Sequence, residues 1–371
     1  MTDPRLTRLA ASLPATVPFV GPETMEREAG EAFRARLGAN ESVFGPSPKA
    51  VAAMEKAAAE SWKYGDSLSH DLRHAIAAYH DVDPAHVLVG EGIDGILGNL
   101  VRLTVAEGGA VVTSAGAYPT FNYHVTGFGG TLHKVPFRGD HEDPDALVDK
   151  AVETGAKLVY ISNPDNPMGS WHDGATVAAM LDRLPDTCLL VLDEAYADFA
   201  PEEAIPDIAP TDTRVIRTRT FSKAYGLAGA RVGYAIGPVD LIAAFDRVRN
   251  HFGMTRVSQD GAVAALADRD WLEKVCRDVE RSKARMSEIA AGNGLRALPS
   301  ATNFVAIDCG RDGGFAREVM LALIARGVFV RMPGVSPLDR CIRITCGTDG
   351  DMDVLAETLP LALEDAARNV R

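Results

Sequence analysis

The amino-acid sequence predicts an α/β protein with a large, doubly wound, mostly parallel β-sheet and a second, smaller α+β unit. The first observation is a series of short apolar runs that alternate with segments of helical periodicity. The second is a change of pattern after about residue 237, where long helical segments replace that alternation. The third is the length of 371 residues, which suggests two domains or one large α/β unit.

The alternation that defines the large unit starts at about residue 86. Strands that are apolar throughout and separated by helices favour a parallel sheet covered on both faces. The expected strands are residues 86–90, 110–114, 157–162, 188–194, 214–220 and 231–237. Helical spacing is clearest at residues 93–105 and 174–184. We therefore expect a large domain over residues 36–250.

The remaining sequence predicts a smaller α+β domain. Long helices are expected first, and three short strands around a helix follow them. The expected helices are residues 238–251, 256–291, 314–326 and a closing helix at 350–371, and the expected strands are 303–308, 328–332 and 341–346. The segment up to residue 35 is expected to pack on this unit, so the small domain would combine residues 1–35 and 251–371.

Composition limits the partners and the location of the protein. The 38 Lys and Arg residues against 51 Asp and Glu residues give a net charge of 38 − 51 = −13, which argues against a nucleic-acid-binding surface. The five cysteines form no C-x-x-C pair, which is typical of a reducing compartment. No signal peptide and no membrane span is expected. We predict a cytoplasmic protein with neither a nucleic-acid nor a membrane partner.

The most informative segment is TFSKAYGLAGARVGYAIG, residues 220–237. Lys223 follows an expected strand and could be an ordinary solvated loop lysine. Its neighbours favour another interpretation, because Gly226 and Gly229 permit a close backbone approach. Three further neighbours are phosphate ligands by residue type, namely Thr220, Ser222 and Arg231. An amine beside a phosphate site is what a pyridoxal 5'-phosphate Schiff base requires.

Several motifs in a fixed order extend this interpretation to nearly the whole chain, residues 17 to 365. They are NESVFGPSP (40–48), GEGIDGI (90–96), YPTF (118–121), NPDNPMG (163–169), DEAY (193–196), the segment around Lys223, and IRITCGT (342–348). With these motifs the sequence resembles the aspartate aminotransferase superfamily, the class I and II aminotransferases of fold type I. Within it, the histidinol-phosphate aminotransferase group looks most similar. The resemblance implies pyridoxal 5'-phosphate as cofactor.

The resemblance assigns roles in cofactor binding. Asp193, at the end of an apolar strand, would pair with the pyridinium nitrogen, although a capping or ion-paired aspartate is the alternative. Tyr196 and Asn166 would contact the ring hydroxyl, and Phe121 would stack on the ring, with ordinary core packing as the alternative for Phe121. The phosphate would be held by Thr220, Ser222, Arg231 and the amides of Gly92, Ile93 and Asp94 at a helix start. Tyr64 would reach the cofactor phosphate of a neighbouring subunit, which implies a homodimer with shared active sites.

Substrate-binding residues follow from the same resemblance. Arg343 lies inside an apolar strand, where an unpaired charge is costly, so an anionic group should meet it. The matching arginine of the superfamily binds the substrate α-carboxylate, with help from the asparagine that matches Asn40. Arg331 matches an arginine that contacts the substrate phosphate in the histidinol-phosphate group. A surface arginine with no such role is an equal alternative.

The expected activity is a ping-pong aminotransferase reaction in which Lys223 is the catalytic residue and no metal takes part. Histidinol phosphate and 2-oxoglutarate are the expected substrates. Phe19, however, stands where the group commonly has a tyrosine that helps to bind the substrate phosphate. An aromatic or other amino-acid aminotransferase, or a phosphoamino-acid decarboxylase of the same fold, therefore remains an alternative. A non-catalytic regulator is disfavoured because the chain has no room for a basic DNA-binding domain.

Overall fold

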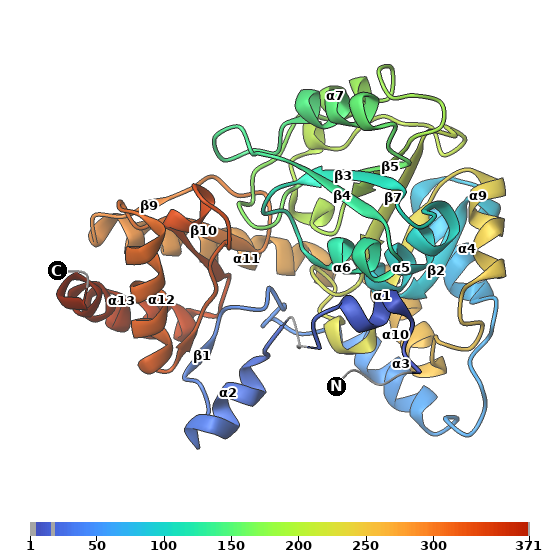
Figure 1. Ribbon diagram of the computed structural model, residues 1–371. Helices are drawn as coiled ribbons and strands as arrows, with labels where there is room; N and C mark the ends of the chain where they lie inside the picture. The colour runs from blue at the N-terminus through green and yellow to red at the C-terminus, as the bar shows by residue number, and fades with distance from the viewer. Residues whose placement is uncertain (1–4, 16–18, 370–371) are drawn as a thin grey trace.

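The computed structural model describes residues 5–15 and 19–369 and shows two units, with the small one beside the large sheet (Figure 1). Within the described residues, the large unit holds a seven-stranded sheet of strand order β2-β8-β7-β6-β5-β3-β4. Only β8 runs against its neighbours β2 and β7, so the predicted mostly parallel sheet is confirmed. The strands are β2 (Val87–Glu91), β3 (Ala110–Ser114), β4 (Thr131–Val135), β5 (Leu158–Ser162), β6 (Leu189–Asp193), β7 (Val215–Thr220) and β8 (Val232–Ile236).

Helices cover both faces of this sheet, which confirms the doubly wound architecture. Successive side chains of a strand point to opposite faces, so Val111 and Val112 of β3 enter different cores. One face is covered by α5 (Gly92–Thr104) and α6 (Thr120–Gly127). The other is covered by α7 (Pro144–Thr154), α8 (Gly174–Ala179), α3 (Pro48–Ala58), α4 (His70–His80) and α10 (Arg256–Ala267).

Among the described residues, two short sheets and three helices form the main part of the small unit. A three-stranded antiparallel sheet has the order β12-β10-β9, and β1 pairs in parallel with β11. These strands are β1 (Ala35–Arg36), β9 (Arg296–Ala297), β10 (Phe304–Asp308), β11 (Val328–Phe329) and β12 (Cys341–Thr345). The helices are α11 (Arg269–Gly292), α12 (Gly313–Ala325) and α13 (Asp349–Asn369). One apolar core joins all of these helices to β10 and β12.

Three expected elements of the sequence are shorter than predicted. The strand expected at residues 328–332 ends at Phe329, and beyond it only Arg331 forms an isolated bridge, with Arg343 of β12. The helix expected at 238–251 is limited to α9 (Val239–Ala244) and one 3-10 turn, because turn-forming residues follow. The helix expected at 174–184 ends at Ala179.

The prediction of one long helix at residues 256–291 is wrong, because the helix is interrupted at Asp268, between α10 and α11. The Asp268 carboxylate accepts hydrogen bonds from Ser47 Oγ at 2.6 Å and from Lys49 Nζ at 2.8 Å, which ties the break to the start of α3. Residues of α10 pack in one core with α3, α4 and β8. We therefore propose that the large domain extends to Asp268 rather than ending at residue 250.

The amino-terminal segment contacts both units. The α2 helix (Pro22–Ala29) joins the small unit, because Glu23 and Glu26 form ion pairs with Arg36 of β1. The α1 helix (Arg8–Ser12) lies beside the large unit, where Leu9 approaches Gly129. Residues 1–4 and 16–18 of the predicted segment lie outside the described residues. None of the helices described here is long and apolar enough to cross a membrane.

Candidate active site

The carboxyl ends of the parallel strands meet at one edge of the large sheet, the usual place for a binding site in such folds. Ser162 ends β5 and pairs with Asp193 at the end of β6, and Thr220 ends β7. A cavity of about 360 Å³ lies at this edge. A second cavity of about 600 Å³ opens toward the small unit, and the two share Asn166 and Lys223 in their walls.

Asp193 is the acidic group of the first cavity. Its side chain is buried, and within the described residues it forms no ion pair with Lys or Arg. Its Oδ2 accepts a hydrogen bond from the Tyr160 hydroxyl at 2.6 Å, and its Oδ1 accepts one from the backbone amide of Ala195 at 3.0 Å. Burial raises the pKa of Asp193 to about 6. The carboxylate is therefore suited to a ligand that brings a proton or a positive charge.

Tyr196 lies at the centre of a polar network on the cavity wall. Its hydroxyl accepts hydrogen bonds from Asn40 Nδ2 at 3.0 Å and from Asn166 Nδ2 at 3.4 Å. Burial raises the pKa of Tyr196, so the free protein keeps the phenol neutral. Asn40 has a positive φ of 55°, an uncommon backbone conformation for a residue other than glycine. Two hydrogen bonds with Thr345 hold this residue: the backbone amide of Asn40 donates to Thr345 Oγ1, and Asn40 Oδ1 accepts from the same hydroxyl.

Lys223 extends its amine to the junction of the two cavities. Its Nζ donates a hydrogen bond to the carbonyl oxygen of Asn40 at 3.1 Å and lies 5.7 Å from the centre of the Tyr196 ring. Burial, together with the positive charge of Arg343, lowers the pKa of Lys223 to about 8. A lysine with such a pKa supplies a neutral amine near physiological pH, as a nucleophile or general base requires.

Hydroxyl, amide and guanidinium groups gather at the other end of the first cavity. Thr220, Ser222 and Arg231 line it, with Ile93 and Asp94 of the first turn of α5. Gly92 begins α5 with a φ of +71°, and a Cβ there would lie 2.5 Å from Arg231 Nη2. Glycine at this position therefore lets the guanidinium lie directly over the start of the helix, where backbone amides favour an anion.

Two arginines line the second cavity. Arg343 Nη1 donates to Asn166 Oδ1 at 2.5 Å, and Nη2 donates to the carbonyl oxygen of Gly38 at 3.1 Å. Its Nε is buried without a partner among the described residues, and burial lowers its pKa. Arg331 donates from Nη2 to the carbonyl oxygen of Val20 at 2.6 Å. Phe19 lines the same cavity.

Comparison with known proteins identifies the family. The model of the family "Aminotransferase class I and II" matches residues 35–359. The chain belongs to the class I and II aminotransferases. A histidinol-phosphate aminotransferase of Anaeromyxobacter sp. (strain Fw109-5) is 37% identical over 342 residues, which cover 91% of this chain and 93% of the relative. One from Moorella thermoacetica is 33% identical, with coverage of 94% and 90%. The predicted pyridoxal phosphate-dependent aminotransferase is therefore confirmed.

Solved structures agree with the fold of this aminotransferase. The histidinol-phosphate aminotransferase from Sinorhizobium meliloti, in complex with pyridoxal-5'-phosphate, is 50% identical and superposes with a TM-score of 0.95, covering 100% of this chain and 99% of that one. An aspartate aminotransferase double mutant from Thermus thermophilus is 24% identical, with a TM-score of 0.80 and coverage of 98% and 99%. At that identity the likeness shows the fold alone, and it confirms fold type I.

The residues present in the aminotransferase fit pyridoxal phosphate. Asp193, a buried carboxylate with no cationic partner in the part of the chain that the structure describes, lies on the wall of the cavity that also holds the amine of Lys223. The gap left by the missing Cβ of Gly92 places Arg231 over the start of α5, which suits a phosphate group. One cavity thus combines a carboxylate that fits a ring nitrogen, an amine that fits an aldehyde carbon, and an anion site that fits a phosphate.

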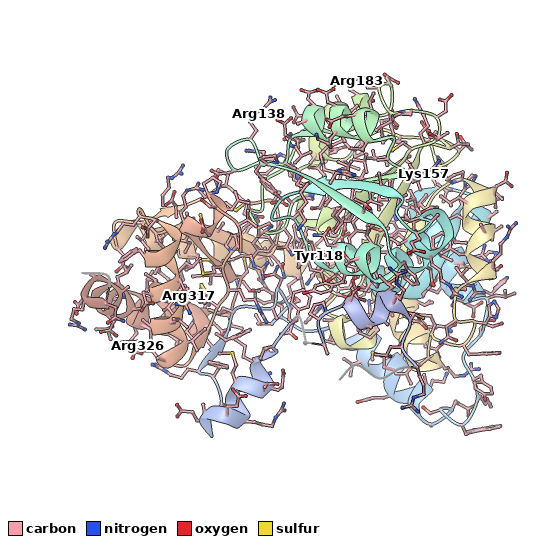
Figure 2. The ribbon with its side chains drawn as sticks, viewed as in Figure 1. Tyr118, Arg138, Lys157, Arg183, Arg317 and Arg326 are labelled. Carbon is pink, nitrogen blue, oxygen red and sulfur yellow. The ribbon has the colours of Figure 1, made fainter. Side chains whose placement is uncertain are left out.

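Two predicted site residues lie elsewhere. Phe121 does not line the cavity but is completely buried in the core between α5, α6 and the sheet. Tyr118, labelled near the centre of Figure 2, is the aromatic residue of the YPTF motif that lines both cavities, so we propose Tyr118 in place of Phe121 as the candidate for ring stacking. Tyr64 is 78% exposed and packs on Phe252, outside the cavities of its own chain.

Sequence reasoning missed several residues of the site. Tyr160 and Ser162 line the first cavity from β5, where their strand pattern indicated only core and sheet positions. Asn303 Nδ2 donates to the carbonyl oxygen of Asn40 at 3.1 Å, and Thr345 Oγ1 also binds Asn40. Thr345 lies two residues after Arg343 in the IRITCGT motif, so the alternation of side chains along that strand could have identified it. No group of three potential metal ligands occurs in the described ranges.

Proposed function

We propose that this aminotransferase takes an amino group from L-histidinol phosphate and transfers it to a 2-oxo acid such as 2-oxoglutarate in two half-reactions. The observation that carries the proposal is the 50% identity, over the entire chain, to the histidinol-phosphate aminotransferase of Sinorhizobium meliloti. The 37% and 33% identical relatives bear the same name. Identity at this level across a complete chain supports a shared substrate more strongly than a shared fold does.

The second cavity supports the proposed substrates because it offers two separate positive groups. Arg343, whose Nε has no hydrogen-bond partner within residues 5–15 and 19–369, would bind the α-carboxylate of the 2-oxo acid. Arg331 would bind the phosphate of the amino donor. The backbones of the two arginines face each other in the isolated bridge between residues 331 and 343, which supports two proposed anion sites that would lie side by side on the small unit.

The residues around the first cavity would divide the chemistry of the half-reaction. Bound pyridoxal phosphate supplies the aldehyde that accepts the amino group and the ring that withdraws electrons from the substrate α-carbon. Lys223 would form the covalent link to that aldehyde in the resting enzyme. Once released, its amine would move the proton of the substrate α-carbon. Asp193 would hold a proton on the ring nitrogen, and Asn166 and Tyr196 would bind the ring hydroxyl.

Phe19 favours a second candidate, an aminotransferase for aromatic amino acids. The residue is 42% exposed, lines the second cavity, and contacts Tyr123 edge to face at 6.4 Å between ring centres. A phenylalanine offers no hydroxyl to a phosphate and adds an apolar surface for an aromatic side chain. The lost hydrogen bond to a charged group would weaken phosphate binding by about 1.5–3 kcal/mol.

An amino-donor screen separates these possibilities. The purified holoenzyme is assayed with 2-oxoglutarate and histidinol phosphate, histidine, phenylalanine or tyrosine, and glutamate formation is measured. We expect kcat/KM for histidinol phosphate to exceed that for each other donor by at least tenfold. Good turnover of phenylalanine and tyrosine without turnover of histidinol phosphate would establish the second candidate. Release of carbon dioxide from a phosphoamino acid without glutamate formation would indicate a decarboxylase.

The assembly that we propose is a homodimer in which each chain contributes Tyr64 to the other active site. The exposed position of Tyr64 outside its own cavities supports this assembly. Trp62 and Leu68 of the same loop region are also exposed, at 79% and 55%. Exposed apolar side chains that gather in one segment favour a protein–protein contact. A cytoplasmic location also remains a proposal.

A further inference from the structure

Tyr160 is a buried tyrosine whose hydroxyl reaches the acid of the cofactor cavity. It belongs to β5, next to β6, and the pair Ser162–Asp193 fixes the register of the two strands. The side chain is completely buried, and Tyr160 also lines the first cavity. The hydroxyl donates to Asp193 Oδ2 at 2.6 Å, within the range of a strong hydrogen bond to a carboxylate.

Among the residues that the structure describes, this hydrogen bond is one of two that hold the Asp193 carboxylate. The other comes from the backbone amide of Ala195 to Oδ1 at 3.0 Å. Each carboxylate oxygen therefore accepts one donor from the protein, and each keeps a lone pair for a ligand. Because the second donor is a backbone group, Tyr160 is the side chain whose removal changes the hydrogen bonding of Asp193 without changing the chain trace.

Phe121 fixes the ring of Tyr160. The two rings stack with their centres 4.7 Å apart and an angle of 15° between their planes. Both residues belong to one apolar core under α5 and α6. A stacked neighbour of this kind prevents the tyrosine ring from turning its hydroxyl away from Asp193. The phenylalanine of the YPTF motif thus acts on the cofactor acid through Tyr160.

We propose that Tyr160 is a positioning residue that orients the Asp193 carboxylate and stabilises its ionised form, so that Asp193 keeps the cofactor ring nitrogen protonated, and that Phe121 holds Tyr160 in place. The inference rests on the proposed contact between Asp193 and the ring nitrogen. It adds to that contact the group that keeps the carboxylate charged in a buried cavity.

The electrostatics of the cavity show why such a donor is needed. Burial raises the pKa of Asp193, and the hydrogen bond from Tyr160 opposes this rise, so that the pKa is about 6 with the hydrogen bond in place. Burial and the nearby Asp193 charge raise the pKa of Tyr160, so the hydroxyl keeps its proton and remains a donor. Without that donor the proton shared between Asp193 and the ring nitrogen would move toward the carboxylate.

The test uses Tyr160→Phe and nuclear magnetic resonance of the holoenzyme loaded with pyridoxal phosphate labelled with ¹⁵N in the ring. The ring nitrogen shift reports protonation directly, and it does not depend on turnover. We expect Tyr160→Phe to move the shift at neutral pH toward the unprotonated value. We also expect kcat to fall about tenfold, with KM changed less than twofold, because one hydrogen bond to a charged group is lost. Phe121→Leu should move the shift in the same direction by a smaller amount.

Two further variants make the outcome decisive. Tyr234→Phe is the matched control, because Tyr234 is also buried and its hydroxyl contacts a side chain in another core, His80 Nε2 at 2.9 Å. It should leave the nitrogen shift unchanged. Asp193→Asn tests the proposed contact itself and should give an unprotonated nitrogen. A shift that moves in Asp193→Asn but not in Tyr160→Phe would overturn the inference and leave the contact intact. A shift that moves in neither would refute the contact.

Discussion

At the scale of single residues, Glu142 is the buried acid that the motifs gave no reason to expect. It lies just before α7, only 2% exposed, and accepts hydrogen bonds from Ser114 Oγ at 2.5 Å and from the amide and hydroxyl of Ser162 at 2.9 and 3.0 Å. Ser162 lines the cofactor cavity beside Asp193, so Glu142 supports the cavity wall from behind. Burial raises its pKa from 4.5 to about 7.

The raised pKa of Glu142 predicts how stability depends on pH. The folded protein keeps the Glu142 proton up to about pH 7, whereas the unfolded chain releases it near pH 4.5. The stabilising contribution of this proton is therefore complete below pH 4.5 and is lost as the pH rises through 7. Glutamine carries no such proton, so its contribution does not change with pH. The free energy of unfolding of Glu142→Gln minus that of wild type should therefore increase by about 2–3 kcal/mol between pH 4.5 and pH 7.5.

Denaturant unfolding at several pH values measures this difference. Only the change of the difference with pH counts, because the substitution also alters hydrogen bonding by an amount that does not depend on pH. Glu203→Gln is a suitable control for the substitution itself, since Glu203 is an exposed glutamate. A Glu142→Gln difference that stays constant with pH would show that Glu142 titrates in the folded protein as it does in the unfolded chain.

The sequence predicted well which motif residues share one site, but it predicted poorly which side of an element each side chain faces. Lys223, Asp193, Asn166 and Tyr196 were all predicted for one site, and they line one cavity. The YPTF motif placed two aromatic rings within four residues but could not tell which one faces the ligand. Phe121 lies in the core on α6, whereas Tyr118, two residues before the start of that helix, lines both cavities. Contacts such as Glu142 with Ser162 depend on the packing of distant segments, which periodicity does not encode.

At the scale of elements, apolar patterns predicted those strands that are buried on both faces. The edge strand β4 was missed because its sequence TLHKV is polar and partly exposed. The break at Asp268 was missed because α10 and α11 continue the same helical periodicity. What separates them is a tertiary contact, the ion pair of Asp268 with Lys49 and its hydrogen bond with Ser47. At this point tertiary packing overrides the local helix propensity.

The start of α5 carries a prediction of its own, the effect of Gly92→Ala on cofactor binding. The new Cβ would lie 2.5 Å from Arg231 Nη2, and alanine at a φ of +71° is strained. The guanidinium must move off the helix start, which weakens the proposed phosphate site. We expect the Kd of the apoenzyme for pyridoxal phosphate, measured by fluorescence titration, to rise about tenfold, the effect of losing one charge-assisted contact.

The control for this element is Gly292→Ala at the end of α11. A Cβ at Gly292 meets nothing within 4 Å, and its φ is not in the left-handed region. This variant should bind the cofactor as wild type does. If Gly92→Ala also binds the cofactor normally, the phosphate does not depend on the placement of Arg231 over α5.

At the scale of the whole molecule, the active site belongs to the junction of the two units. Residues of the large unit line the first cavity. The second cavity is lined in addition by Arg331 and Arg343 of the small unit. Lys223 lies in both walls. Changes in how the two units pack would therefore alter the substrate side of the site more than the cofactor side.

The proposed homodimer adds a third component, and complementation between two variants tests it. In Lys223→Ala the catalytic amine is lost, so transamination should fall by at least a thousandfold. In Tyr64→Ala each chain would fail to complete the neighbouring site. If Tyr64 acts across the dimer, a heterodimer of the two variants has one site with both changes and one native site. Random exchange makes about half of the dimers mixed, so activity should recover to about a quarter of wild type.

The measurement is the rate of glutamate formation after the two variants are mixed, unfolded and refolded together. A mixture of Lys223→Ala with Asp193→Ala serves as the control, because Lys223 and Asp193 line the same cavity of one chain and no mixed dimer then has a native site. That control should show no recovery. If the mixture with Tyr64→Ala also stays inactive while chains that carry two different affinity tags copurify as mixed dimers, then Tyr64 does not serve the partner's site. The exposed loop around Trp62 and Tyr64 would then have to act only as a contact surface.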